Sequence, residues 1–190
     1  MGSERLKLTP PSLKYSEEMF EVINECKAEF SPFLPWVSDS LTKEQLELNI
    51  QDATNNFANF TGEFWFNIIE KQTGAFIGAI GFMIRDDTVP YFEIGYWLQT
   101  SKTGLGYVSE AVRIIEEYAF IQKGAKRVEI RMAGSNLKSQ AVAKRCGYQL
   151  EDRLANDRRL PSGDMDSTLV YAKISQSKCV LLILNVWHFY

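Results

Sequence analysis

The sequence predicts an α+β or α/β domain in which helices cover a mixed β-sheet. Two observations support this class. Stretches of alternating or continuous apolar residues, typical of strands, are interspersed with stretches whose apolar residues recur at the helical period. In addition, a strand at 91–98, a helix at 106–122 and a strand at 126–132 follow one another as in a β-α-β unit. The two strands of such a unit can lie parallel, so we expect a sheet with both strand directions.

The predicted elements follow the order strand, two helices, three strands, helix, strand, helix and two strands. The predicted strands span residues 5–9, 63–70, 75–84, 91–98, 126–132, 148–154 and 167–173. The predicted helices span residues 16–30, 42–60, 106–122 and 136–146.

Capping residues mark where these helices begin and end. Ser16 is expected to cap the first helix, and Thr42 with Gln45 forms a capping-box pattern before the second. Gly124 and Gly147 follow the last two helices, at the position where a left-handed residue often ends a helix. The elements therefore have local signals as well as apolar periodicity.

Turn residues separate the strands. Residues 72–74 are typical of a hairpin turn, and the pair Asp86 and Asp87 predicts the next turn. Loops are expected at 31–40, which is aromatic and interrupted by prolines, and at 155–166, which is polar and contains proline and glycine. We expect a single domain over 1–174, followed by an apolar tail at 175–190 whose role the sequence does not define.

Composition excludes several classes of protein. The net charge is −3 and no long basic block is present, which argues against nucleic-acid binding through phosphate contacts. No apolar run reaches the ~20 residues that a membrane helix needs, and no signal-peptide pattern begins the chain. Three widely spaced cysteines form no disulfide framework, which suits a reducing cytoplasm. A cytoplasmic protein without membrane or nucleic-acid partners is therefore expected.

The chain contains one histidine, His188. A Ser-His-Asp triad and a histidine-rich metal site are therefore improbable, and we predict no metal. Any catalysis must proceed largely without imidazole. Cys146, just before Gly147, and Cys26, on an apolar helix stripe, are expected to be core residues, since no histidine is available to activate a thiol.

The turn between the strand at 91–98 and the following helix is the most informative segment. Gly104 and Gly106 allow a ligand to approach the backbone, and the first amides of the helix lack intrahelical partners. Together with the helix dipole they form an anion site suited to a pyrophosphate, to which Ser101 and Lys102 add a hydroxyl and a charge. No Walker or dinucleotide fingerprint is present. A helix start that merely requires two glycines remains the alternative.

The residues Glu93-Ile-Gly-Tyr-Trp-Leu, followed by Gly104-Leu-Gly-Tyr-Val-Ser-Glu-Ala-Val, resemble the acetyl-CoA motif of GNAT superfamily N-acetyltransferases. A second block, from Asn136 to Glu151, resembles the segment NxxSxxxAxKxGF of the branch that acetylates the N-termini of ribosomal proteins. The resemblance covers about residues 5–174. The chain departs from it at Ser101, where the superfamily usually has Gln or Arg, and in the tail at 175–190.

The resemblance implies a GNAT-like fold: a mixed, mostly antiparallel sheet with a central splayed parallel strand pair, flanked by helices. It also implies acetyl-CoA as cosubstrate, with its pantetheine arm between the strands at 91–98 and 126–132. The residues expected to bind the cosubstrate are Tyr96, Trp97, Leu98, Ser101, Lys102, Thr103, Gly104, Leu105, Gly106, Tyr107, Val108, Asn136 and Ser139.

The implied reaction is direct attack of an amine on acetyl-CoA in a ternary complex. Glu93 is the candidate base, directly or through a water, and Ser139 is the candidate acid or sulfur ligand for the leaving thiolate. A surface or salt-bridged carboxylate and a backbone-bonded serine are the structural alternatives. An α-amine has a pKa of ~8 against ~10.4 for lysine, so a protein N-terminus needs less help from a base.

The favoured acceptor is the N-terminal amine of a protein, in particular a ribosomal protein. A small amine (a polyamine, amino acid or antibiotic) and a CoA-binding protein without turnover remain alternatives. The protein is expected to be a monomer or homodimer. Arg158 and Arg159 are expected to be solvated, with an acidic acceptor or a CoA phosphate as alternative partners. The following aromatic residues are expected in the core rather than in a groove: Phe30, Phe33, Trp36, Phe57, Phe60 and Trp65.

Overall fold

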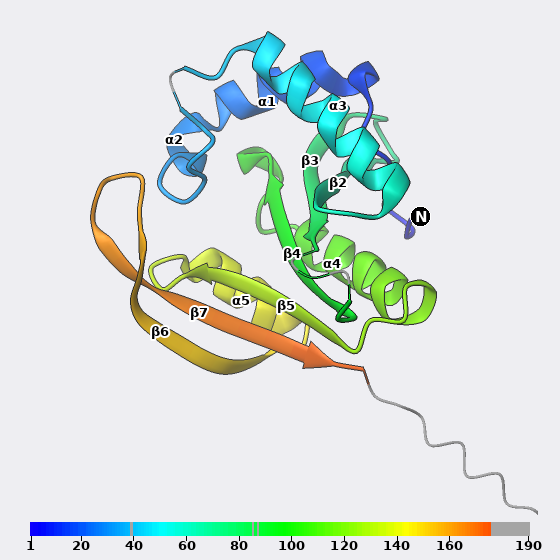
Figure 1. Ribbon diagram of the computed structural model, residues 1–190. Coiled ribbons are helices and arrows are strands. Elements are labelled where there is room, and N and C mark those ends of the chain that lie inside the picture. The colour runs from blue at the N-terminus through cyan, green and yellow to red at the C-terminus, as the bar shows by residue number, and fades with distance from the viewer. Residues whose placement is uncertain (39, 85, 87, 176–190) are drawn as a thin grey trace, which may run out of the picture.

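The computed structural model describes residues 1–38, 40–84, 86 and 88–175. Its centre is a seven-stranded sheet with the strand order β1-β2-β3-β4-β5-β7-β6 (Figure 1). The strands are β1 (Leu6–Thr9), β2 (Glu63–Glu70), β3 (Phe76–Met83), β4 (Tyr91–Leu98), β5 (Arg127–Ala133), β6 (Gln149–Arg159) and β7 (Met165–Ile174). This arrangement confirms the predicted mixed α+β class.

Every pair of neighbouring strands is antiparallel except β4 and β5. These two run parallel but pair at only three positions, from Tyr91 opposite Arg127 to Glu93 opposite Glu129. Beyond Glu93 the remaining halves of β4 and β5 no longer pair. The expected splayed parallel pair at the centre of the sheet is therefore present.

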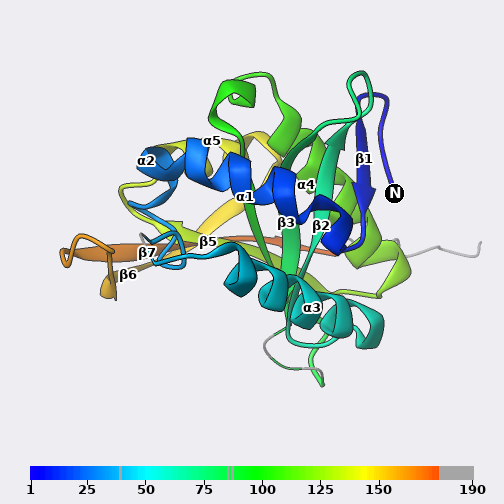
Figure 2. The ribbon, with the colours of Figure 1, turned by 90° about the horizontal axis from the view of Figure 1, so that it is seen from above.

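Helices lie on both faces of the sheet (Figures 1 and 2). The helices are α1 (Ser16–Glu25), α2 (Lys27–Phe30), α3 (Lys43–Asn59), α4 (Tyr107–Glu117) and α5 (Leu137–Arg145). One face carries α1 and α3 over β2 and β3, and the other carries α4 and α5. The α1 and α3 layer ends near β4, so no helix of the described part of the chain covers β5, β7 and β6 on that face (Figure 1).

The first and third predicted helices differ from the structure in their boundaries or continuity. The helix predicted over 16–30 is interrupted at Cys26, whose backbone leaves the helical region with φ −99° and ψ 12°. Ser16 is the first residue of α1 rather than its cap, and its hydroxyl donates to Glu47. The helix predicted over 106–122 changes to a π-helical turn (Tyr118–Gln122).

The loop predicted at 155–166 is wrong for most of its length. β6 continues to Arg159 and β7 begins at Met165, so only a tight turn remains between them. The polar composition of these residues is typical of a loop. The hairpin nevertheless extends beyond the core as two strands, which are stabilised by backbone pairing and not by apolar burial (Figure 1). The β6 and β7 hairpin therefore forms an arm that projects past α5 (Figure 1).

The Thr42 cap is confirmed, since the Gln45 amide donates to the Thr42 hydroxyl at 3.2 Å. The side chain of Gln45 donates to Asn49 and does not complete the capping box. Among the residues that the structure describes, no helix is long and apolar enough to cross a membrane. Asp87 and the predicted tail, with Cys179 and His188, lie outside the described residues.

Candidate active site

The opening between β4 and β5 exposes backbone groups in the middle of the sheet. β4 pairs with β3 as far as Leu98, whereas its pairing with β5 stops at Glu93. The β5-facing backbone groups between Ile94 and Leu98 therefore have no strand partner. A peptide-like arm such as pantetheine can pair with this edge, because strand edges offer rows of donors and acceptors.

The N-terminus of α4 lies directly after this edge. Gly104 and Gly106 have φ of +79° and +84°, which is the left-handed region that favours glycine. The backbone amides of Tyr107, Val108 and Ser109 donate to no described residue, and the first intrahelical bond runs from Glu110 to Gly106. These amides and the helix dipole form an anion site at the end of the open edge.

The side chains of Lys102 and Tyr107 do not extend toward this anion site. The Lys102 ammonium lies 2.8 Å from a Glu70 oxygen, and the Tyr107 hydroxyl donates to the same carboxylate at 2.6 Å. The Lys102 bond, with those from Tyr107 and Thr73, lowers the pKa of Glu70 to about 2. Lys102 and Tyr107 thus anchor the glycine turn to β2, which the sequence did not indicate.

The other residues of the glycine turn leave mainly backbone groups available to a ligand. Ser101 belongs to a short 3₁₀ turn and is exposed, and the Thr103 hydroxyl donates to the Thr100 carbonyl at 2.8 Å. Leu105 is exposed, and its carbonyl accepts a bond from Arg5 at 3.1 Å. Val108 packs partly against the core. Contacts from this turn to an anion therefore rest mainly on amides.

Ser139 and Tyr96 meet across the opening in the sheet. Asn136 caps α5, where its side chain accepts from the Ser139 amide at 3.0 Å. The Ser139 hydroxyl lies 2.8 Å from the Tyr96 hydroxyl, which joins α5 to β4. Burial raises the pKa of the Tyr96 phenol, so it stays protonated at neutral pH. Two hydroxyl groups therefore stand together beside the open edge.

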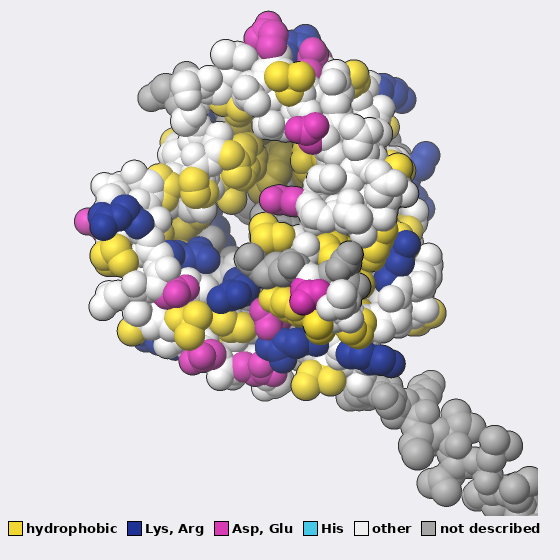
Figure 3. All heavy atoms as spheres, viewed as in Figure 1, with side chains coloured by type: hydrophobic (Ala, Val, Ile, Leu, Met, Phe, Trp, Pro, Cys, Tyr) yellow, Lys and Arg dark blue, Asp and Glu magenta, His cyan; other side chains and the backbone are white. Residues whose placement is uncertain are grey.

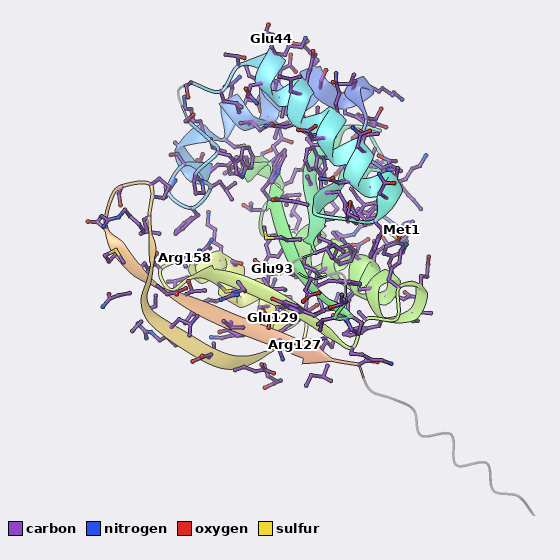
Figure 4. All side chains as sticks on the ribbon, in the orientation of Figure 1. Met1, Glu44, Glu93, Arg127, Glu129 and Arg158 are labelled. Atoms are coloured by element: carbon purple, nitrogen blue, oxygen red, sulfur yellow. The ribbon has the colours of Figure 1, made fainter. Side chains whose placement is uncertain are left out.

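Glu93 faces the opposite side of the sheet. Side chains alternate along β4, so Phe92, Ile94 and Leu98 join the core around α4, whereas Glu93 and Trp97 lie on the α1 and α3 side. There Glu93 lines a cavity of about 480 Å³ between the helices and the sheet. Figure 4 shows Glu93 beside the opening, and Figure 3 shows the surrounding hollow.

Gly95 and two aromatic residues shape this cavity. A side chain at Gly95 would meet no atom within 4 Å, so the glycine leaves open space next to Glu93. Trp36 is 42% exposed and lies 6.2 Å from Trp97, ring centre to ring centre. The prediction that the aromatic cluster lies in the core is wrong for Trp36, which is exposed. Phe30 is buried, Phe57 and Phe60 pack against the core, and Trp65 packs against the core while it also lines the cavity.

The sequence missed the other carboxylates of the cavity. Asp52 on α3 and Glu63 on β2 line it together with Glu93. Their spacing of 11 and 30 residues along the chain gives no local signal; only the packing of α3 against β2 brings them together. Cys26 and Cys146 are buried as expected, and burial raises the pKa of the Cys146 thiol.

A hydrogen-bonded cluster fixes the paired end of β4 and β5. The Tyr91 hydroxyl donates to Glu129 at 2.8 Å, and Arg127 bridges Glu129 to Glu151 on β6. Burial, with this bond to Glu129, raises the pKa of Tyr91 to about 12. The cluster holds the two strands together immediately before they diverge (Figure 4).

Comparison with known proteins agrees with this geometry. The family model described as an acetyltransferase (GNAT) domain matches residues 5–149. The chain therefore belongs to the GNAT acetyltransferase family, which confirms the expected resemblance at the level of the family.

Individual relatives extend the comparison. An N-acetyltransferase called p20 from Bacillus licheniformis is 34% identical over 47% of this chain and 50% of its own. The chain spans about half the length of the first curated relatives it matches. The ribosomal-protein-serine acetyltransferase of Escherichia coli K12 is 28% identical over 93% of this chain and 96% of its own, which supports the ribosomal-protein branch.

A solved structure shows the same fold. It is the microcin C7 self-immunity acetyltransferase MccE in complex with acetyl-CoA and AMP. It is 29% identical to this chain, covers 91% of it and 94% of its own chain, and has a TM-score of 0.82.

Proposed function

We propose that this protein transfers acetyl from acetyl-CoA to the N-terminal α-amine of a protein, by direct attack in a ternary complex. The observation that carries the proposal is the opening between β4 and β5. It joins an anion site and an open strand edge to a carboxylate-lined cavity on the other face. A thioester placed in the opening is accessible to an amine in the cavity.

Acetyl-CoA would bind through the backbone. The amides at the start of α4 receive the pyrophosphate, and the free edge of β4 pairs with the pantetheine arm. A β4 amide near Tyr96 polarises the thioester carbonyl, in the role of an oxyanion hole. This backbone recognition explains how the site tolerates Ser101 and a Lys102 that is held by Glu70.

The chemistry uses a carboxylate and a hydroxyl. Glu93 accepts the proton of the amine, directly or through a water, as nitrogen bonds to the acetyl carbon. The carbon–sulfur bond then breaks, and the Ser139 hydroxyl, hydrogen-bonded to Tyr96, donates to the leaving thiolate. One proton leaves the amine and one is taken up by the CoA thiol. This chemistry needs no imidazole and no metal.

A protein N-terminus fits this site better than a lysine. The α-amine has a pKa of ~8, so its neutral form is accessible near neutral pH with a carboxylate base alone. The relative named for acetylating ribosomal-protein serine supports a ribosomal acceptor. We further propose a cytoplasmic monomer or homodimer that acts without nucleic-acid or membrane partners.

A small aromatic-bearing amine is the second candidate acceptor. The exposed Trp36 and the half-buried Trp97 form an aromatic wall in the acceptor cavity, and the related MccE structure contains AMP. Flat rings stack favourably on such walls. An amine attached to a nucleotide would use the same base and the same opening.

Thiol release tests the proposal. The protein is incubated with acetyl-CoA and a panel of N-terminal peptides, polyamines, amino acids and aminoacyl nucleotides, and free CoA is followed with DTNB. Release with N-terminal peptides is expected. Release only with small amines would favour the second candidate, and CoA binding without release on any acceptor would favour a non-catalytic CoA-binding protein.

A further inference from the structure

We propose that the acceptor carries a carboxylate within its first three residues, and that Arg131 and Arg158 bind this carboxylate. This inference deepens the proposed function and rests on it for the amine. It arises from the sheet surface beyond the opening, where no described helix covers β5, β7 and β6 on the cavity side (Figure 1).

Arg131 lies on the same face of the sheet as Glu93. Paired residues of neighbouring strands point to the same face, and Glu93 is paired with Glu129. Arg131 follows Glu129 by two residues and therefore shares that face, whereas Ile130 and Met132 belong to the core on the other side. Its position is on β5 just past the point where the strands diverge.

Arg131 makes no hydrogen bond or ion pair with any described residue. Arg127, four residues earlier, differs in this respect, because it forms ion pairs with both Glu129 and Glu151. Arg131 is nevertheless half-buried. Arg131 has an electrostatic interaction with Tyr91, but its guanidinium donors make no hydrogen bond to a described residue, so they are available to an anionic ligand.

Arg158 presents a second guanidinium on this surface. Its Nε donates to the Thr168 hydroxyl at 3.0 Å, which holds the side chain on the cavity face. Thr168 precedes Val170 by two residues, and Val170 pairs with Arg131. The terminal nitrogens of Arg158 donate to no described residue. Figure 4 shows Arg158 on the hairpin, across the opening from Glu93.

The cavity and the strand surface beside it therefore carry charged groups of opposite sign. Asp52, Glu63 and Glu93 line the cavity under the helices, whereas Arg131 and Arg158 lie on the uncovered strands. Figure 3 shows Lys or Arg side chains along the lower side of the hollow and a carboxylate at its rim. An acceptor with an ammonium group at one end and a carboxylate at the other matches this pattern.

The pairing register of β4 and β5 predicts where along the acceptor the carboxylate lies. Arg131 is two residues beyond the level of Glu93, or about 6.6 Å along the strand. An extended acceptor peptide covers that distance in two residues, so an acidic side chain at position 2 or 3 reaches Arg131. The cosubstrate does not require these arginines, since its pyrophosphate is expected at the start of α4.

Peptides with Ser-Asp and Ser-Asn N-termini, otherwise identical, test the inference. We expect the Asp peptide to be acetylated with a kcat/KM about tenfold higher, consistent with one charge-assisted bond. Arg131→Gln should remove this preference, Arg131→Lys should retain part of it, and Arg158→Gln should weaken it. Arg159→Gln is the matched control, because Arg159 pairs with Met165 on the opposite face and binds the Gly163 carbonyl.

A measurement of peptide binding distinguishes a failure of this inference from a failure of the proposed function. Calorimetric titration of both peptides into the CoA-bound protein should give a tenfold lower Kd for the Asp peptide, and only when Arg131 is present. That result without acetylation would support the inference and contradict the proposed function. Equal acetylation and equal binding of the two peptides would overturn the inference alone. A preference for an aminoacyl adenylate analogue over both peptides would also overturn it.

Discussion

At the scale of single residues, Glu93 is the group on which the proposed chemistry depends most. It lines the acceptor cavity at the position where β4 and β5 stop pairing. The sequence could indicate Glu93 through its motif, but not the cavity around it. Asp52 and Glu63, which share this cavity, come from distant segments, and no local pattern of residues predicts that they meet there.

Replacement of Glu93 tests its role as a base. Glu93→Gln should lower kcat/KM about 100-fold at pH 7, the usual effect of losing a general base. The loss should shrink at pH 9, because the α-amine (pKa ~8) is then mostly neutral without help. Rates for a Ser-terminated peptide at both pH values provide the measurement. Equal losses at pH 7 and pH 9 would contradict the assignment.

Tyr96 and Ser139 should act as a pair. Ser139→Ala and Tyr96→Phe are each expected to lower kcat about tenfold, and the double variant little further, since both remove the same donor to the thiolate. Steady-state kinetics of the four proteins measures this coupling. Fully additive losses would show that the two hydroxyls act independently. Unchanged Kd values for CoA serve as the control for binding.

At the scale of elements, the glycine turn before α4 is held by an ion-pair cluster rather than by its own sequence. Glu70 on β2 binds Lys102 and Tyr107, which flank the turn. The glycine spacing predicted the anion site, whereas the role of Lys102 could not be inferred. Its partner is 32 residues away, and only the packing of β2 beside the turn brings the two together.

This cluster should make stability depend on pH. The folded-state pKa of Glu70 is about 2, below its unfolded value, so its stabilisation is present above pH 4.5 and disappears as pH falls toward 2. Glu70→Gln should lower the free energy of unfolding by about 2 kcal/mol at pH 7 and by much less at pH 3. Urea unfolding at the two pH values tests this. A constant difference would exclude the ion pair as its source.

A substitution at Gly95 on β4 tests the proposed position of the acceptor. Gly95→Val should raise the KM for the acceptor peptide at least tenfold, because the new side chain enters the open space beside Glu93. The Kd for CoA should remain unchanged, since CoA is proposed to bind at the opening and at the start of α4. Kinetics together with CoA titration separate the two effects. Weakened CoA binding with a normal acceptor KM would contradict this placement of the two substrates.

At the scale of the whole molecule, the proposed function places the two substrates on either side of the opening in the sheet. Alternating patterns predicted nearly all strands, and the β-α-β unit predicted the parallel pair. The prediction included both strands of the β6 and β7 hairpin but missed their outer parts, because a polar arm paired mainly through its backbone has no apolar pattern. That arm carries Arg158, so the part of the fold that the sequence did not predict also contains a residue that we propose binds the acceptor.

The most direct test of the account is the position of the acetyl group on a peptide that offers both amines. A peptide with a free N-terminal serine and an internal lysine is incubated with the protein and acetyl-CoA, and tandem mass spectrometry locates the added acetyl group. The account predicts acetylation at the α-amine alone. Acetylation at the lysine, or no incorporation at any concentration of protein, would contradict it.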